Sequence, residues 1–194
     1  MTAKKMPEGG AFIVELPPRR DTEAVVEKHW DPDLSGGVTF EGQHFCFPEG
    51  LSVDAALQWM EESLLSVRLS LQGLLKGECA RCLGDASLAI SDDLRYLYYL
   101  RGTVLGKDTH LQSDDGFLPV EMDAWGRTIN LADQVWESLW VLLPRKLLCR
   151  EDCAGLCQNC GANLNEGACS CAPQRDVRFD ALRDFVADNE DVMM

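Results

Sequence analysis

The sequence predicts an α+β fold. We expect a mostly antiparallel β-sheet body with a long hairpin, one or two packing helices, and a small zinc-stabilised, cysteine-rich C-terminal appendage. Two observations predict it. Apolar and polar residues alternate with the period of a half-buried strand over much of residues 11–100, whereas helical spacing is clear only after residue 130. Eight of the nine cysteines form four close pairs, and six of those eight follow Pro144.

Four regions are expected along the chain. Residues 1–10 are polar and are predicted to be a disordered tail, and residues 11–144 form the body. Residues 145–175 have almost no periodic apolar pattern, so that metal would have to organise this cysteine-rich, zinc-binding segment. Residues 176–194 carry apolar residues at helical spacing before an acidic end, which predicts a C-terminal helix and tail.

Length and charge exclude several classes of protein. The 194 residues carry a formal net charge of −14, whereas a broad nucleic-acid-binding face would be basic. Such an acidic charge is common in soluble bacterial proteins and also suits a basic partner. No apolar run reaches the roughly 18 residues that span a bilayer, and the N-terminus lacks the apolar region of a secretory signal. We therefore expect a cytoplasmic protein. In the reducing cytoplasm, clustered cysteines are metal ligands more often than they form disulfides.

The first half of the body is predicted to consist of strands. Residues 11–16 form a strand that ends at two prolines, and residues 38–47 form another before a turn at residues 48–50. Apolar residues alternate again over residues 53–59, which predicts a further strand. A helix capped by Ser52 remains an alternative for this stretch.

A long hairpin is the clearest element. Apolar residues occupy odd positions from Leu65 to Leu75, and the alternation resumes at Ala86 and continues to Tyr98 after a polar break at residues 91–93. Residues 79–85 would then form the tip of the hairpin. Two strands would hold this turn, and the turn would present the sulfurs of Cys79 and Cys82.

One helix is predicted in the body. A polar loop over residues 106–116 and a strand over residues 117–123 precede it. Asn130 can cap a helix that runs from residue 131 to about residue 143 and is closed by Pro144. Tryptophans at helical spacing are usually core residues and rarely line a cofactor site. The face towards the core is expected to carry Val135, Leu139 and Leu142, with Trp136 and Trp140 beside it.

The last two cysteine pairs have the spacing of a local zinc site. Cys157 and Cys160 are separated by two residues, which lets both sulfurs converge on one ion, and Gly161 permits the positive φ that such a turn often needs. Cys169 and Cys171 follow after a loop rich in glycine and asparagine that can double back. These four thiolates would satisfy one tetrahedral ion.

The remaining pairs leave two assignments open. Cys79 and Cys82 can share an ion with Cys149 and Cys153, which would join the hairpin tip to the segment after the helix and close a long loop. Alternatively, one ion can take all four cysteines within residues 149–160. Consecutive short gaps would crowd that ion, but spacing alone does not decide between the two.

Other cysteine chemistry fits less well. An iron–sulfur cluster could use the same thiolates, but the cysteine run of a ferredoxin is absent. A thioredoxin-like pair at Cys79 and Cys82 would need a helix after it, where a strand is predicted. Cys46 is expected to be a small buried residue of a strand. His29, His44 and His110 form no triad, and no phosphate loop or nucleophile elbow is present, so we predict no catalytic and no cofactor-binding residues.

Four stretches resemble the YceD family, also called domain of unknown function 177 or large ribosomal RNA subunit accumulation protein. They are Glu78-Cys-Ala-Arg-Cys-Leu83, Thr128-Ile-Asn-Leu131 with the helix that ends at Pro144, the cysteine-rich stretch of residues 148–165, and residues 176–182. The resemblance covers roughly residues 50–187. Asn130 stands where the family usually has aspartate, and Val177 stands where it usually has proline.

The resemblance implies a non-enzymatic role in ribosome biogenesis, in support of 23S ribosomal RNA accumulation and 50S assembly. The implied partner is a ribosomal protein, for instance ribosomal protein L32, or the pre-50S particle. Contact with ribosomal RNA would be local, through a cluster such as Arg145, Lys146 and Arg150. No membrane and no small-molecule substrate are expected. The alternatives are a zinc-dependent RNA-processing enzyme and a zinc-stabilised binding module or chaperone unrelated to ribosomes.

Overall fold

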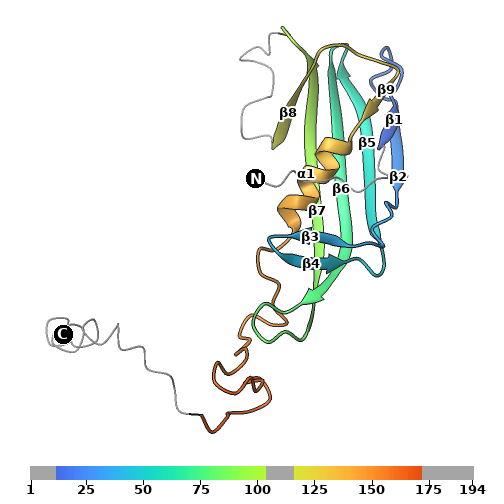
Figure 1. The fold of residues 1–194 in the computed structure, drawn as a ribbon. Helices are drawn as coiled ribbons and strands as arrows, with labels where there is room; N and C mark the ends of the chain where they lie inside the picture. Colours follow the sequence, from blue (N-terminus) through green and yellow to red (C-terminus); the bar gives the residue numbers. More distant parts are fainter. Residues whose placement is uncertain (1–11, 104–115, 172–194) are drawn as a thin grey trace, which may run out of the picture.

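A computed structural model describes residues 12–103 and 116–171 of the chain, and the account that follows concerns those residues. Their architecture is a large sheet of seven strands, a second sheet of two strands and one helix (Figure 1). The elements are β1 (Ile13–Glu15), β2 (Val25–Trp30), β3 (Val38–Phe40), β4 (Gln43–Cys46), β5 (Leu51–Glu61), β6 (Leu64–Glu78), β7 (Asp85–Leu100), β8 (Phe117–Met122), β9 (Thr128–Asn130) and α1 (Ala132–Leu142).

The centre of the large sheet is the antiparallel run β5, β6 and β7. β6 pairs with β5 on one side and with β7 along its whole length on the other. Most odd-numbered side chains of β5 and β6 are buried because they alternate towards the core, as at Val53, Trp59, Val67 and Leu71. The prediction of a strand over residues 53–59 is confirmed, and the helical alternative is wrong.

The hairpin of β6 and β7 has the predicted course. β7 runs without interruption through residues 91–93, because Ser91 and Asp93 face solvent on the outer side of the sheet. Asp93 pairs there with Arg68 of β6. β8 extends the sheet in parallel beside the second half of β7.

Residues 38–47 form two strands and not the single strand that we predicted. A tight turn separates β3 from β4, with Glu41 at φ 50° and Gly42 at φ 81°. Two successive residues with positive φ are typical of the two-residue hairpin turns that match strand twist. β2 was not predicted from the sequence, because its inward positions are poorly buried: Val26 and Trp30 are half-buried, and Lys28 is exposed.

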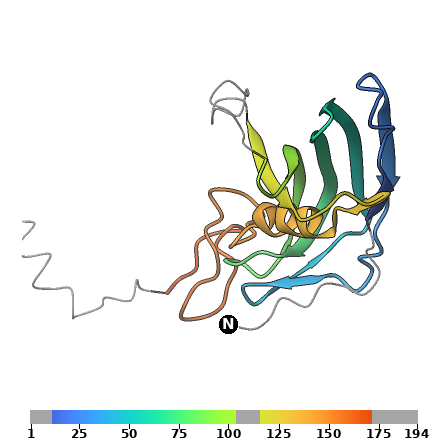
Figure 2. The same ribbon diagram turned by 90° about the horizontal axis from the view of Figure 1, so that it is seen from above.

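α1 packs across the face of the sheet that carries the buried side chains, and the sheet curves around it with β8 and β2 at opposite edges (Figure 2). Val135 and Leu139 of α1 are fully buried, as their spacing predicts. Trp136 packs edge-on against Phe12, and Phe12 packs in the same way against Trp30 of β2. These contacts join the N-terminal segment, the helix and the edge of the sheet.

The helix begins one residue later than predicted. Leu131 occupies the N-cap position, and Asn130 is the last residue of β9. The Asn130 side chain still accepts a hydrogen bond from the backbone N–H of Ala132 at 3.1 Å, so that it satisfies one free donor of the first turn. β9 pairs with β1 in the two-stranded sheet, which confirms the first predicted strand.

After α1 the chain continues beyond the tip of the β6–β7 hairpin as an appendage of turns (Figure 1). Within residues 145–171 the pairing is limited to one bridge, between Leu156 and Asn163. No helix among the described residues is long and apolar enough to cross a membrane. The predicted tail at residues 1–10, almost all of the polar loop at residues 106–116 and the helix and tail at residues 176–194 lie outside the described residues.

Candidate metal centres

The first candidate site begins at the tip of the β6–β7 hairpin. The backbone N–H of Cys79 donates to the carbonyl of Gly84 at 2.8 Å, and the N–H of Leu83 donates back to the carbonyl of Cys79 at 3.0 Å. Leu83 adopts a positive φ of 60° to close this turn. The closed turn directs the sulfurs of Cys79 and Cys82 to one side, where Cys79 is buried and Cys82 half-buried.

The appendage docks on the same turn through backbone groups. Ala80 donates its N–H to the carbonyl of Leu147 at 2.8 Å, and Leu156 donates its N–H to the carbonyl of Arg81 at 3.2 Å. The Arg81 guanidinium donates to the carbonyl of Cys153 at 2.9 Å. These contacts hold the segment between Leu147 and Leu156 against the hairpin tip.

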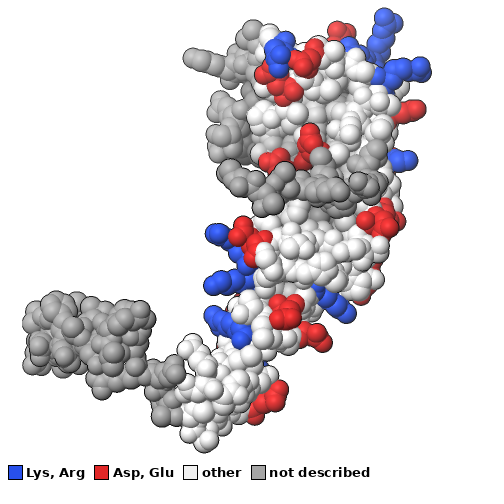
Figure 3. All heavy atoms as spheres, in the orientation of Figure 1, with Lys and Arg blue, Asp and Glu red and all other residues white. Residues whose placement is uncertain are grey.

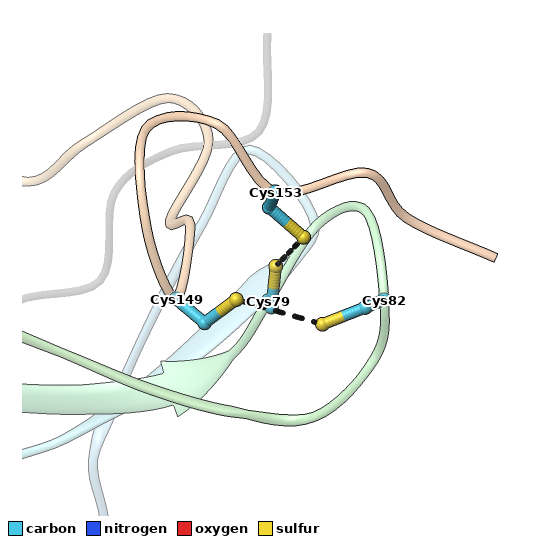
Figure 4. A group of neighbouring side chains, drawn as sticks. All are labelled: Cys79, Cys82, Cys149 and Cys153. Atoms are coloured by element: carbon cyan, nitrogen blue, oxygen red, sulfur yellow. Dashed lines mark hydrogen bonds between the residues drawn. The ribbon is translucent and has the colours of Figure 1, made fainter. Parts of the chain in front are cut away.

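The docked segment brings Cys149 and Cys153 onto the two hairpin cysteines (Figure 4). The sulfurs of Cys79 and Cys153 lie 3.8 Å apart, those of Cys82 and Cys149 lie 3.7 Å apart, and all four lie within 4.8 Å of one another. Tetrahedral zinc, with zinc–sulfur bonds of about 2.3 Å, places its sulfurs about 3.8 Å apart. This four-sulfur group therefore fits a tetrahedral ion.

The second candidate site lies wholly within the appendage. Cys157, Cys160, Cys169 and Cys171 also have their sulfurs within 4.8 Å of one another. The N–H of Gly161 donates to the carbonyl of Cys157, and the N–H of Cys157 donates to the carbonyl of Ala162, both at 2.8 Å, which forms the expected knuckle. The four cysteines are half-buried or exposed, so that this site is more open to solvent than the first.

Each group contains thiols whose pKa is lowered beside thiols whose pKa is raised. The backbone N–H of Cys82 lowers the pKa of Cys79 to about 6, and the N–H of Cys160 lowers the pKa of Cys157 to about 6. Hydrogen bonding to Cys153 raises the pKa of Cys149 to about 12, and hydrogen bonding to Cys160 does the same for Cys171. Four adjacent sulfurs cannot all be thiolates unless a cation compensates their charge, and a divalent metal would supply that charge.

The structure groups the eight predicted ligands as the split assignment does, and it places the four cysteines of residues 149–160 in two different groups. That these residues bind metal remains a prediction. The prediction for Cys46 is wrong, because Phe45 and Phe47 take the inward positions and leave Cys46 exposed. His29 and His44 lie on separate strands with other partners, and His110 lies outside the described residues.

Sequence reasoning missed a polar residue that supports the first site. Asn165, from the loop between Cys160 and Cys169, donates its side-chain amide to the sulfur of Cys153 at 3.3 Å. This donor lowers the pKa of Cys153. A loop rich in glycine and asparagine was visible in the sequence, but nothing in the spacing shows that one of its amides reaches the other sulfur group.

The cationic cluster suggested by the sequence is only partly free. Arg150 donates to the side chain of Asn165 at 2.8 Å and pairs with Asp152, whereas Arg145 and Lys146 are exposed. On the face that Figure 3 shows, basic and acidic side chains are interspersed over the body and the appendage. The described surface in this view therefore has no continuous basic face.

Together these features define a class of protein: a curved, mostly antiparallel sheet whose longest hairpin joins a cysteine-rich appendage that could bind metal. The chain belongs to the YceD family, since the family model described as "Large ribosomal RNA subunit accumulation protein YceD" matches residues 67–186. The matched residues include β7, α1 and both sulfur groups. The family is thus described by the accumulation of large-subunit ribosomal RNA, and its description names no catalytic reaction.

The curated relatives that match the chain share only about a quarter of the aligned residues with it. Proteins of Mycobacterium bovis and of two Mycobacterium tuberculosis strains, each named only as uncharacterised, are 26% identical to the chain over 147 residues. The match covers 74% of this chain and 65% of each relative, so that the chain spans slightly less than two thirds of their length. No solved structure matches the chain.

Proposed function

We propose that this protein is a non-enzymatic ribosome biogenesis factor that supports accumulation of 23S ribosomal RNA and assembly of the 50S subunit. The observation that carries the proposal is the family match over residues 67–186, which includes the appendage and most of the hairpin. A factor of this kind would act in the cytoplasm. An RNA-processing enzyme would instead need an open metal position and a general base, whereas sites made of four cysteines are usually closed and structural.

We further propose that each sulfur group binds one structural zinc ion. Two features support zinc: both donor sets consist of four sulfurs, and the sulfur spacing of the first group suits a tetrahedral ion. The ion would supply the positive charge that lets all four sulfurs ionise, and it would fix the appendage on the hairpin. An iron–sulfur cluster would use the same ligands but would give a coloured protein that contains iron and sulfide.

The appendage is the proposed docking element, with a ribosomal protein such as L32 or the pre-50S particle as the partner. It projects beyond the body, which leaves it accessible (Figure 1). Arg145 and Lys146 are exposed at its start and could add a local contact to ribosomal RNA. The strongly acidic chain favours a basic protein over RNA as the main partner.

The test has two parts. Cells that lack the protein should contain less 23S relative to 16S ribosomal RNA, and the full chain should restore the ratio; an unchanged ratio would contradict the proposed role. Purified protein should sediment with pre-50S particles and lose this association when zinc is removed or residues 145–175 are deleted. Association that survives both treatments would show that the appendage is not the docking element.

The local RNA contact needs its own comparison. The double charge reversal Arg145→Glu and Lys146→Glu should weaken sedimentation with the particle. Arg20→Glu/Arg95→Glu is the matched control, since both residues are exposed cations of the body, one in the connection between β1 and β2 and one on β7. Equal effects of the two changes would argue against a specific contact next to the metal sites.

Absence of cleavage when purified protein is incubated with precursor ribosomal RNA would count against the enzymatic alternative.

A further inference from the structure

Asn165 lies between the two sulfur groups. In the chain it belongs to the loop of residues 161–168, which connects the two ligand pairs of the second group. In space its side chain contacts the first group, through the amide donated to the sulfur of Cys153 at 3.3 Å. The half-buried side chain of Asn165 therefore comes from the loop of the second site but contacts a sulfur of the first site.

The contacts of this amide fix its orientation. The carbonyl oxygen of the Asn165 side chain accepts from the backbone N–H of Ala154 and from the guanidinium of Arg150, both at 2.8 Å. Both donors belong to the segment that carries Cys149 and Cys153. With its oxygen held by two donors, the amide can present only its nitrogen to the sulfur of Cys153.

The loop itself is held in place by further contacts. The Asn165 backbone N–H and side-chain nitrogen both donate to the side-chain oxygen of Asn163, at 3.1 and 2.8 Å. The N–H of Leu164 donates to the carbonyl of Gly155 at 2.9 Å, and Asn163 bridges to Leu156. The same loop has Cys160 before it and Cys169 after it, so that an ion at the second site would close it at both ends.

We propose that Asn165 couples the two metal sites. An ion held by Cys157, Cys160, Cys169 and Cys171 closes the loop and thereby places the Asn165 amide on Cys153, which strengthens metal binding at the first site. Hydrogen-bond donors to metal ligands orient them and stabilise the bound state, and coupling between two binding events is reciprocal. Metal at the first site therefore also favours metal at the second. This inference rests on the proposed metal binding.

The experiment is a cadmium titration of the full chain against a competing chelator, followed by cadmium NMR. Each site gives its own resonance, assigned with Cys79→Ser/Cys82→Ser and with Cys157→Ser/Cys160→Ser. Asn165→Ala should weaken binding at the first site on the order of 10-fold to 100-fold, the usual cost of losing a residue that supports a metal ligand. Asn165→Asp keeps the acceptor for Ala154 and Arg150 but removes the donor to sulfur, and should weaken the first site as well.

The coupling itself is tested by a double-mutant cycle. Disabling the second site with Cys157→Ser/Cys160→Ser should weaken the first site about 5-fold or more in the presence of Asn165 and much less in the Asn165→Ala background. Gln158→Ala is the matched control. Gln158 is an exposed amide of the appendage, between Cys157 and Cys160, and it makes no hydrogen bond to another described residue. Near-ultraviolet circular dichroism of the body tryptophans shows whether each variant keeps its fold.

Three results would overturn the inference. Unchanged affinity of the first site in both Asn165 variants would remove its role, and strictly additive costs in the cycle would remove the coupling, while both would leave metal binding intact. If the wild-type chain gave no cadmium resonance from either site, the proposed metal binding and the coupling would fail together.

Discussion

The sulfur atoms of Cys79 and Cys153 lie 3.8 Å apart, although the two residues are 74 positions apart in the chain. One belongs to the tip of the longest hairpin and the other to the appendage after α1. A metal ion at this point would close a loop that contains β7, β8, β9 and the helix. The second sulfur group, by contrast, closes only a short stretch of the appendage.

The two sites should therefore differ in their effect on the body. In zinc-saturated protein, Cys79→Ser/Cys82→Ser should lower the free energy of unfolding by about 4 kcal/mol, the loop-closure entropy of a link across about 70 residues. Cys157→Ser/Cys160→Ser should lower it by much less, on the order of 1 kcal/mol, because its own loop lies outside the body and only the weaker binding at the first site is felt there. Denaturant unfolding followed by tryptophan fluorescence measures both, and equal losses would contradict the distinction.

Helix α1 offers a matched pair for testing the core. Leu139→Ala should cost about 2–5 kcal/mol, because Leu139 is fully buried against the sheet and its truncation leaves a cavity. Val141→Ala should stay within about 0.5 kcal/mol, since Val141 is 78% exposed on the same helix. The measurement is chemical denaturation of each variant. A large loss at Val141 would mean that another surface covers the outer side of α1.

Gly155 allows a close approach between the appendage and the hairpin tip. Its φ is +76°, and a Cβ there would meet the carbonyl oxygen of Arg81 at 3.2 Å. Gly155→Ala should weaken cadmium binding at the first site, because it disturbs the docking that brings Cys153 to Cys79. Gly161→Ala is the control, with a φ of +73° but nothing within 4 Å of the added carbon. Equal effects would show that backbone strain alone is responsible.

His29 should titrate above its ordinary value of about 6.5. A hydrogen bond from its ring to Asp54, 2.7 Å long, and one to Asp31, 3.1 Å long, raise its pKa. The interaction favours the protonated ring, so that its stabilisation is present at acidic pH and is lost as the pH rises through the folded-state pKa. Asp54→Asn should lower the pKa measured by proton NMR, and more so than Asp31→Asn. A titration that neither change moves would contradict these contacts.

The strands and the helix could be predicted where the apolar residues of an element repeat with a regular period. β5, β6 and α1 bury one face each, so that their apolar residues repeat at two or at three to four positions. β2 was not predicted because it lies at the edge of the sheet, where an inward position can carry an exposed polar residue such as Lys28 and the apolar alternation is lost. Residues 38–47 were misread because Glu41 adopts a positive φ that glutamate rarely takes.

The candidate sites were predictable as a set of residues but not as a geometry. Cysteine is a specific chemical signal, and the paired spacing identified all eight cysteines of the two sulfur groups. Spacing could not decide which pairs share an ion, because the answer depends on how residues 147–156 dock on the hairpin tip through backbone hydrogen bonds. The contact of Asn165 with Cys153 could not be predicted for the same reason, since a contact between two sites has no signature in the sequence.

We propose that the eight cysteines form two separate zinc sites, one of which joins the hairpin to the appendage. The most direct measurement is the zinc content per chain of native protein and of Cys79→Ser/Cys82→Ser. We expect two zinc ions in the native chain and one in the variant. Two ions in the variant would contradict the proposed pair of sites, because metal binding would then not depend on the hairpin cysteines.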